Sequence, residues 1–463
     1  MVKNYITEKV KSILKIKEIT QNKIYKNNGE ISKVFRVTIT DGFLNLSKAK
    51  QQEEEVKFRE FLESTESEVQ ITLKTMNYSA KSYVDRIKSQ IKKQLEFNRD
   101  LLSKEAELGL SNFLKYIKSK SYTLPALREY YITLSYDDYK IEKLGGDTYD
   151  GNRYLKYLES LKSGSNSKID KILNYQRKYA DIVFNNYLKK KEEPAFWERE
   201  IKLLNTFFQV EELDNDHIAG LYNSFFYESI YTNNKFYTII NLIEEYAEQE
   251  KNTTFLEYKY LFEWEYKVSN NEASINNRYL RIAGIFDYPK SATSNFWDNV
   301  FVRGNYDLNF YYKQTSNKQV LEELEKRYKN IDYQLSEIKK LDKEDEALEL
   351  SRKNYERYIE FIKNQNDKSD EKMFILSTYI LLKGVDYKSL SDLSKRLSIL
   401  WSNSNLNARI LPVRDLSEDI KYVVPINSNG PMKNYKFITS SSLMKYYPFM
   451  VDFSNLRNLD RVK

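Results

Sequence analysis

The sequence predicts an α+β protein in which two split-βαβ-like layers of sheet and helix follow one another in tandem, with long helical hairpins inserted. Three observations support this class. Short runs alternate apolar and polar side chains with the period of a strand, longer runs repeat apolar side chains with the period of a helix, and the same order of elements occurs twice. The length of 463 residues is sufficient for two or three domains.

The first half-domain, residues 1–230, opens with a predicted β-hairpin. Residues 33–40 contain alternating β-branched side chains, and Asp41-Gly42 follows them directly. An Asp-Gly pair favours the two-residue turn of a hairpin. We therefore expect residues 43–46 to form the returning strand.

A capped helix and a strand come next. The hydroxyl of Ser47 is typical of a helix N-cap, and the helix that it begins is expected to break at residues 64–67. Residues 68–75 then alternate strictly, with two faces formed by Val69, Ile71 and Leu73 and by Gln70, Thr72 and Lys74. This alternation predicts a half-buried strand, with only its apolar face in the core.

The remaining elements of the first half-domain follow from the same periodicities. We expect a long amphipathic helix or helical hairpin over 79–118, a strand over 128–136, a helix over 168–190, a strand over 205–211 and a short helix capped at Asp214. Residues 231–277 are predicted as a helical, aromatic-rich connector, and their sequence does not assign them to either layer.

The second half-domain, residues 278–415, repeats this order. The predicted elements are a strand over 278–286, a short helix over 294–302, a strand over 306–313, a helical hairpin over 320–363, a strand over 372–383, a helix over 389–402 and a strand over 407–413. The break at residues 341–344 predicts that the two arms of the hairpin fold back as an antiparallel pair. Residues 416–463 form the last predicted segment, separate from this half-domain.

The composition excludes several kinds of chemistry. The chain has no cysteine, so it has no disulfide framework, thiolate nucleophile or cysteine-ligated zinc, which is consistent with a reducing cytoplasm. Its 74 basic and 67 acidic side chains are mixed along the chain, so the net charge of +7 is no nucleic-acid footprint. No run approaches the ~18 apolar residues of a membrane-spanning helix. We expect a soluble or peripheral protein.

Catalytic motifs are not found in the sequence. A nucleotide-binding loop of the form G-x-x-x-x-G-K-[ST] is missing, and its nearest imitation, Gly384 with Lys388-Ser389, lacks the second glycine and predicts a strand-to-helix turn. The single histidine, His217, lies beside Asp214, which is typical of a helix N-terminus. We therefore expect no catalytic, cofactor-binding or metal-binding residues in this chain, and no enzymatic activity of its own.

Three stretches of the chain together resemble a known family. They are residues 29–74 with the Asp41-Gly42 turn, residues 278–415 from Tyr279-Leu-Arg-Ile-Ala-Gly-Ile-Phe286 to Ala408-Arg-Ile-Leu-Pro-Val-Arg414, and an exit made of Val424-Pro425, residues 438–443 and Tyr447-Pro448-Phe449. Their order and spacing resemble the amino-terminal, non-motor half of the TraC-type and TraE-type ATPases of conjugation and type IV secretion. The resemblance covers nearly the whole chain.

The resemblance implies a docking and assembly role in a DNA-transfer or pilus-assembly machine, and a cytoplasmic location, peripheral at the inner face of the cell membrane. The implied partners are inner-membrane channel components, neighbouring copies of the chain, and a motor domain on the same or a separate polypeptide. Residues 416–463 would be the exit segment toward that motor, and ATP would act only through the motor. Within the exit, Tyr447, Pro448 and Phe449 are the expected docking residues for the motor or another partner, and ordinary core packing is the alternative interpretation of these aromatic side chains.

Two other function classes compete with this interpretation. The long helical arms over 79–118 and 320–363 are also typical of a structural or scaffold protein of a phage or mobile element. The small basic excess and the many tyrosines fit a nucleic-acid-binding module, whose binding would fall steeply with added salt.

Overall fold

The computed structural model describes the chain in stretches, with single positions between some of them. They are residues 8–38, 43, 46–75, 88, 104–120, 128–136, 193–227, 229–232, 235–256, 266–269, 271–275, 278–289, 296–297, 305–340, 345–365, 371–412, 419–427 and 435–449. The predicted helix over 168–190 lies outside this part of the chain, as do most of the predicted helix over 79–118 and most of the predicted short helix over 294–302.

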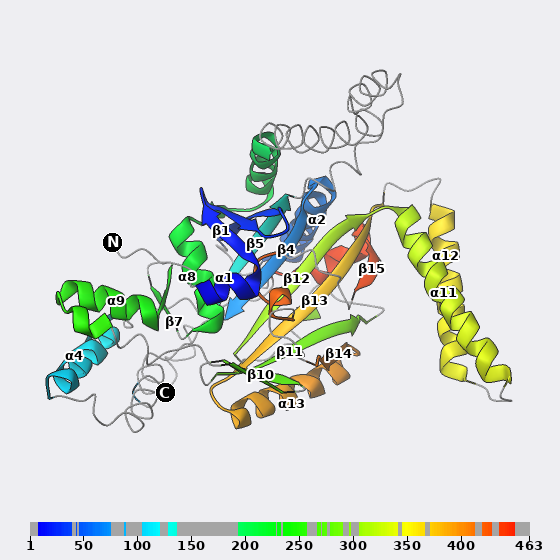
Figure 1. The fold of residues 1–463 in the computed structure, drawn as a ribbon. Coiled ribbons are helices and arrows are strands. Elements are labelled where there is room, and N and C mark those ends of the chain that lie inside the picture. The colour runs from blue at the N-terminus through cyan, green and yellow to red at the C-terminus, as the bar shows by residue number, and fades with distance from the viewer. Residues whose placement is uncertain are drawn as a thin grey trace, which may run out of the picture.

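A large antiparallel sheet forms the centre of the molecule (Figure 1). Its main path runs β1-β2-β3-β5-β4-β12-β13-β11-β10-β9, and every neighbouring pair is antiparallel. The strands on this path are β1 (Ile16–Thr20), β2 (Lys23–Lys26), β3 (Ile31–Val37), β4 (Glu68–Thr75), β5 (Arg128–Tyr136), β9 (Tyr266–Ser269), β10 (Glu272–Ile275), β11 (Arg278–Asp287), β12 (Tyr306–Thr315) and β13 (Met373–Gly384).

Three shorter strands join the sheet beside this path. They are β6 (Val210–Glu212) on β3, β14 (Asn407–Ile410) on β11 and β15 (Lys436–Thr439) on β13. β15 and β11 pair with different parts of β13, so the exit segment extends the sheet where β11 does not reach.

The two predicted half-domains share this one sheet. β3, β5 and β4 come from the first half and β12, β13 and β11 come from the second. They meet where β4 pairs with β12, from Val69 opposite Tyr312 to Leu73 opposite Leu308. We call this pairing the seam. The mixed α+β class is confirmed, whereas the layers are not separate sheets, because backbone hydrogen bonds between edge strands join them.

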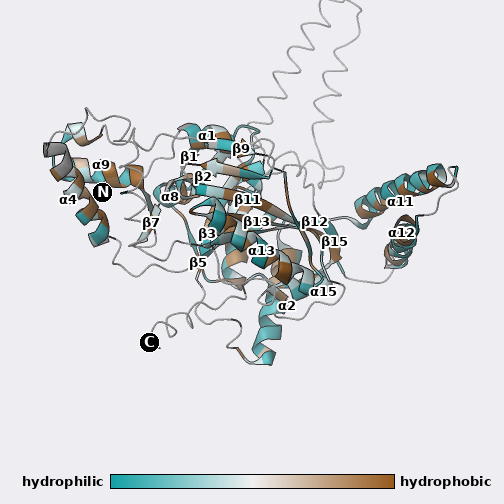
Figure 2. Cartoon of the chain, turned by 90° about the horizontal axis from the view of Figure 1, so that it is seen from below, coloured by the Kyte–Doolittle hydropathy of each residue, from teal (hydrophilic) through white to brown (hydrophobic). Residues whose placement is uncertain are grey.

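Helices cover both faces of the sheet, and Figure 2 shows α1 and α2 on opposite sides of the strands. On one face, α2 (Lys48–Ser64) and α13 (Tyr387–Asn403) contribute apolar side chains to a large core that includes Phe58 and Trp401. On the other face, α1 (Glu8–Leu14) and α8 (Asn215–Phe226) build a second core with Val10 and Tyr222. Both faces of the central strands are therefore buried.

A helical arm extends away from the sheet at the right of Figure 1. It consists of α11 (Asn317–Lys340) and α12 (Glu346–Gln365), which pack as the predicted antiparallel pair. Ion pairs cross between the two helices, from Lys363 to Glu325 at 2.9 Å and from Arg352 to Asp332 at 3.5 Å. The base of the arm is held by a small apolar cluster: Val320, Leu324, Ile362, Met373 and Phe437.

The connector 231–277 is only partly helical. It contains most of the two-stranded sheet of β7 (Ser229–Thr232) and β8 (Lys235–Thr238), then α9 (Ile239–Gln249), and finally β9 and β10 of the large sheet. α9 packs on α4 (Lys104–Lys120), the described end of the predicted long helix, through Phe113, Tyr246 and Phe255. Tyr246 and Phe255 of the connector thus belong to a small separate core, whereas Tyr231 and Phe236 belong to the second core of the large sheet.

Two predicted strands are wrong. Residues 43–46 form no strand at their described positions, because Phe43 turns inward and its ring packs 4.7 Å from that of Tyr447. Residues 205–207 continue a helix that runs over 193–207, and only β6 follows as a strand. The side chain of Phe208 at the end of this helix packs against Phe61, so tertiary contacts override the local β-branched and aromatic pattern.

The predicted exposure of β4 is also wrong. Gln70 and Thr72 are completely buried and Lys74 is nearly so, although all three lie on the face predicted to be polar and solvated. A later part of the chain, described below, covers that face.

Candidate functional site

A segment near the end of the described chain runs across the polar face of the sheet. Residues 420–427, which begin with the 3-10 turn η4 (Ile420–Tyr422), cross the strands instead of lying along them. We call this the crossing segment. Its apolar side chains are buried in the second core: Ile420, Tyr422, Val423, Val424 and Ile426.

The crossing segment begins over β13 and β12. The ring of Tyr422 stacks on that of Tyr379 of β13, with centroids 4.8 Å apart and an interplanar angle of 15°. From β12, the hydroxyl of Tyr311 donates to the carbonyl oxygens of Lys421 at 3.3 Å and Tyr422 at 3.1 Å.

The next two carbonyl groups lie over the seam. Asn309 of β12 donates its amide to the carbonyl oxygen of Val423 at 3.2 Å. Gln70 of β4 donates to the carbonyl oxygen of Val424 at 2.8 Å. Consecutive residues of the segment are therefore bound by strands from different half-domains.

The pattern continues over β5 and β3. The carbonyl oxygen of Pro425 accepts hydrogen bonds from Thr133 at 3.2 Å and from Tyr222 of α8 at 2.8 Å. The carbonyl oxygen of Ile426 accepts one from Ser32 at 3.3 Å. A backbone that crosses the strands does not join their hydrogen-bond ladder, so side chains satisfy its buried carbonyl groups instead.

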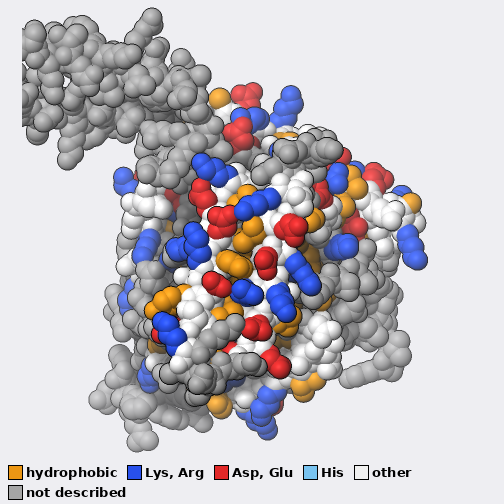
Figure 3. All heavy atoms as spheres, turned by 90° about the vertical axis from the view of Figure 1, so that its right-hand side faces the viewer, with side chains coloured by type: hydrophobic (Ala, Val, Ile, Leu, Met, Phe, Trp, Pro, Cys, Tyr) orange, Lys and Arg blue, Asp and Glu red, His pale blue; other side chains and the backbone are white. Residues whose placement is uncertain are grey.

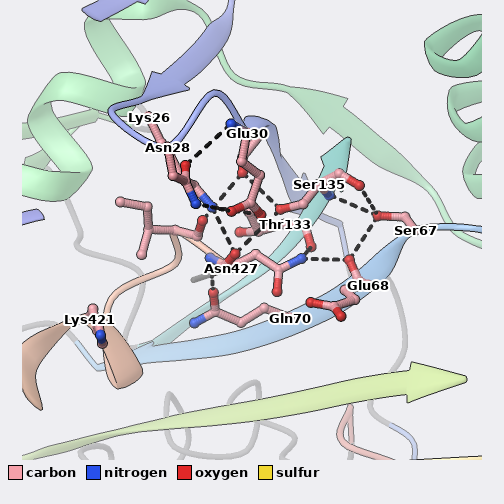
Figure 4. Close-up of polar contacts among 12 residues, drawn as sticks. Lys26, Asn28, Glu30, Ser67, Glu68, Gln70, Thr133, Ser135, Lys421 and Asn427 are labelled. Carbon is pink, nitrogen blue, oxygen red and sulfur yellow. Dashed lines mark hydrogen bonds and ion pairs between the residues drawn. The ribbon is translucent and has the colours of Figure 1, made fainter. Parts of the chain in front are cut away.

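The segment ends at Asn427, which is drawn with its neighbours in Figure 4. Its φ of 48° lies in the left-handed region that asparagine tolerates better than most residues. Its backbone N–H donates to Oε1 of Gln70 at 2.5 Å, and its side-chain amide donates to the carbonyl of Glu68 at 2.5 Å. Its own carbonyl accepts from Nζ of Lys26 at 2.7 Å.

The polar side chains at the seam also bind one another. Oδ1 of Asn309 accepts a hydrogen bond from Thr72 at 2.7 Å and from Nε2 of Gln70 at 3.0 Å. These contacts connect β4 with β12 beyond their backbone pairing. Because the low-polarity interior strengthens such bonds and penalises unpaired groups, this network specifies the seam.

A buried charge cluster lies at the end of the seam. Asp307 of β12 binds Nζ of Lys383 at 2.6 Å and lies 3.6 Å from Nζ of Lys74 of β4. Its carboxylate also accepts the backbone N–H of Thr75 at 2.7 Å. Burial acts to raise the pKa of Asp307, but Lys383 and Lys74 outweigh it and hold that pKa below its usual value.

Lys74 is in a different electrostatic environment, since it is buried beside other cations. Burial, together with Lys383 and Arg278, keeps the pKa of Lys74 well below that of an ordinary lysine, although Asp307 acts in the opposite direction. Its ammonium group lies 3.4 Å from the ring centroid of Phe225. Carbonyl groups at the C-terminal end of α8 accept from these cations: Ser224 from Lys74 at 3.5 Å, and Tyr227 from Arg278 at 3.0 Å. The negative end of the helix dipole thus helps to compensate the buried positive charge.

The predicted docking residues lie on the opposite face of the sheet, inside the first core. Tyr447 and Phe449 are almost entirely buried, as is Pro448. The ring of Phe449 lies 5.2 Å from that of Tyr130 of β5 and 5.4 Å from that of Phe208. These side chains fill the core of the chain itself, and a docking role for them stays a prediction.

The two other residues singled out in the sequence have structural roles. β13 ends at Gly384, and α13 begins after its N-cap Asp386, whose side chain accepts from the backbone of Ser389 at 2.7 Å. The predicted strand-to-helix turn is therefore confirmed. His217 lies in the first turn of α8, and its Nδ1 is 2.7 Å from Oδ1 of the N-cap Asp214, as expected of a helix start.

The polar residues that hold the crossing segment could not be identified from the sequence pattern. Gln70 and Asn309 sit in strands whose polar positions are typical of a solvent-facing surface, and Asn427 sits in a segment with no periodicity. The sequence offered one signal: the polar side chains at these positions are uncharged amides and hydroxyls. Such groups are more often buried with hydrogen-bond partners than charged side chains are.

Comparisons with known proteins give no assignment: no protein-family model and no curated protein matches this chain. Among the residues that the structure describes, no group of three or more His, Cys, Asp or Glu side chains is arranged to hold a metal ion. Within the same residues, no helix combines the length and the apolar character needed to cross a membrane.

Proposed function

We propose that this chain is the docking and assembly part of a conjugative DNA-transfer or type IV secretion ATPase, and that it positions a nucleotide-hydrolysing motor whose phosphate-binding loop it lacks. Its partners would be inner-membrane channel components, neighbouring copies and the motor itself, at the cytoplasmic face of the membrane. The proposal starts from the resemblance of residues 29–74, 278–415 and the exit to that family.

The crossing segment is the observation that carries the proposal. It lies in the exit, between the second half-domain and the position where the family resemblance places a motor. Its backbone is bound by side chains from β12, β4, β5, β3 and β2, so both half-domains hold it. A motor attached beyond such an anchor would be connected to both half-domains and not to one strand, which suits a positioning role.

The helical arm supports the assembly part of the proposal. Side chains on its outer surface are exposed although they are large and apolar: Tyr333, Leu350 and Phe361. Figure 3 views the molecule from the side on which the arm lies, and its basic and acidic side chains are intermixed instead of forming one basic area. Mixed charge around apolar side chains favours a protein partner over nucleic acid or an anionic membrane.

Transfer of DNA by the native host tests this function. An in-frame deletion of the gene should abolish transfer to recipient cells, and the wild-type gene supplied in trans should restore it. The purified chain should hydrolyse no ATP by itself. Unchanged transfer in the deletion strain would refute the proposal and would favour a scaffold unrelated to conjugation.

The arm is tested in the same assay with matched variants. We expect the triple substitution Tyr333→Ala, Leu350→Ala and Phe361→Ala to lower transfer at least about tenfold without changing the melting temperature, because these side chains support no core. The control replaces three side chains of similar exposure near α13: Val385→Ala, Tyr387→Ala and Ile399→Ala. Equal transfer by both variants and the wild type would exclude the arm as the docking surface.

A further inference from the structure

The seam between the half-domains is covered on both faces by residues from the exit. On the polar face, the crossing segment binds Asn309 through Val423 and Gln70 through Val424. Neither half of the sheet can move away from the other without breaking one of these contacts. Further along the chain, β15 pairs with β13, and the residues that follow it pack on the opposite face.

These later residues span the seam on that opposite face. Tyr446 packs on the second half-domain: its backbone carbonyl accepts from Nε1 of Trp297 at 3.2 Å, and its hydroxyl donates to the carbonyl of Pro289 at 3.0 Å. Tyr447 packs on the first half-domain, with its ring 5.5 Å from that of Phe58 in α2. Adjacent residues are thus packed on different half-domains.

Phe58 connects this packing directly to the seam. Its ring lies 5.4 Å from that of Tyr312, the β12 residue that pairs with Val69 of β4. It also lies 6.2 Å from the ring of Phe449. The aromatic cluster therefore closes over the seam on the face opposite to the crossing segment.

We propose that the described residues of the stretch 420–449 act as a clamp that holds the seam from both faces, so that release of the crossing segment and opening of the seam are one cooperative event. In the closed state the polar side chains of the seam bind the crossing segment. In the open state those groups are hydrated and the aromatic cluster on the opposite face is loosened as well. The clamp is then a switch for the relative position of the two half-domains. This proposal is argued from contacts within the chain and does not depend on which partner the chain binds.

Hydrogen exchange on the full chain tests the clamp. Asn427→Ala removes the side-chain bond to Glu68 and the preference for the left-handed backbone. We expect faster amide exchange, on the order of tenfold, in β4, in β12 and also in β15, while β10 keeps its wild-type rate. The matched control is Asn330→Ala, at an exposed position on the arm.

A second measurement uses the absence of native cysteine. Leu73 and Leu308 are paired residues across the seam and lie in the core on the face opposite to the crossing segment, so the double variant Leu73→Cys and Leu308→Cys can be closed by a disulfide without removing a group that binds the segment. Comparing the oxidised with the reduced form of this one protein changes only the seam. Oxidation should slow exchange of the backbone N–H groups of Val423 and Ile426 and of β15 together.

The outcomes separate clearly. Exchange that rises only in the crossing segment of the Asn427→Ala variant, with β15 unchanged, would overturn the clamp. So would identical exchange of the crossing segment in the oxidised and reduced forms of the cysteine pair. If Asn427→Ala does not fold, the cysteine pair decides alone.

Discussion

The side chain of Gln70 holds both ends of the stretch from Val424 to Asn427, although more than three hundred residues separate it from them in the sequence. Its amide nitrogen donates to the carbonyl of Val424 at 2.8 Å, and its oxygen accepts the backbone N–H of Asn427 at 2.5 Å. The amide of this one residue on β4, the strand of the first half-domain at the seam, thus fixes the geometry of the crossing segment. This contact leads to the first of four predictions.

Gln70→Leu should lower the free energy of unfolding by about 3 kcal/mol, because it leaves the buried backbone N–H of Asn427 without its partner and removes one of the two hydrogen bonds accepted by the carbonyl of Val424. Urea unfolding of the purified chain measures this change. Gln334→Leu, at an exposed position on the arm, is the matched control and should change stability by less than about 0.5 kcal/mol. Similar stability of the two variants would contradict the structural importance of this contact.

Lys74→Met should change the pH dependence of stability. Burial holds the pKa of Lys74 in the folded state below that of an ordinary lysine, so the unfolded state binds the proton more tightly. Wild-type stability therefore contains a contribution that is present above the unfolded pKa of about 10.4 and is lost as pH falls toward the folded pKa.

The measurement compares the two proteins by urea unfolding at several pH values from neutral up to the unfolded pKa of lysine. The methionine side chain of the variant carries no titratable proton, so the stability of the variant relative to the wild type should decrease as pH rises through this range. Asp307 keeps its bond to Lys383 in both proteins, and its own titration lies far below this window. A difference that does not vary with pH would show that Lys74 is not held in the way described.

Phe449→Ala should lower the free energy of unfolding by about 3 to 5 kcal/mol, since it removes a buried ring between Tyr130 and Phe208. Any loss of motor binding by this variant would therefore be accompanied by loss of stability. Phe361→Ala, which truncates an exposed ring on the arm, should cost less than about 0.5 kcal/mol. Wild-type stability of Phe449→Ala, combined with weaker recovery of a motor protein, would instead favour direct docking by Phe449.

Gly384→Ala should destabilise the chain by about 1 to 3 kcal/mol. A Cβ atom at this position would lie 2.6 Å from Cβ of Leu390 and 2.8 Å from the carbonyl oxygen of Asp386, where β13 turns tightly into α13. Gly109→Ala is the opposite case: its Cβ would meet the ring of Phe255 at 3.8 Å, and alanine is the better helix former. Thermal melting should therefore move in opposite directions for the two variants, and a shift in the same direction would be inconsistent with this packing.

The local pattern of the chain was sufficient to predict most of its central elements. The antiparallel arm formed by α11 and α12 was predicted from an apolar stripe interrupted at residues 341–344. The caps at Ser47 and Asp214 and the strands β4, β5, β11, β12 and β13 were predicted as well. These features depend on neighbours in sequence, through hydrogen bonds in the first turn of a helix or through the period of a strand.

The candidate site could not be predicted in this way, because its partners come from distant parts of the chain. Alternation in β4 distinguishes an apolar face from a polar one, but it does not say whether water or another segment meets the polar face. Only the folded chain brings residues 420–427 over Gln70, Thr72 and Asn309 and buries them.

The sequence by itself thus determined the order of most helices and strands, the arm, and the lack of a nucleotide-binding loop. The tertiary structure decided that the two half-domains form one sheet, that the exit crosses it, and that Tyr447 and Phe449 are core residues. The physical reason is that strand pairing and burial are properties of contacts between segments. A pattern along one segment limits those contacts, but the free energy of the whole chain selects among them.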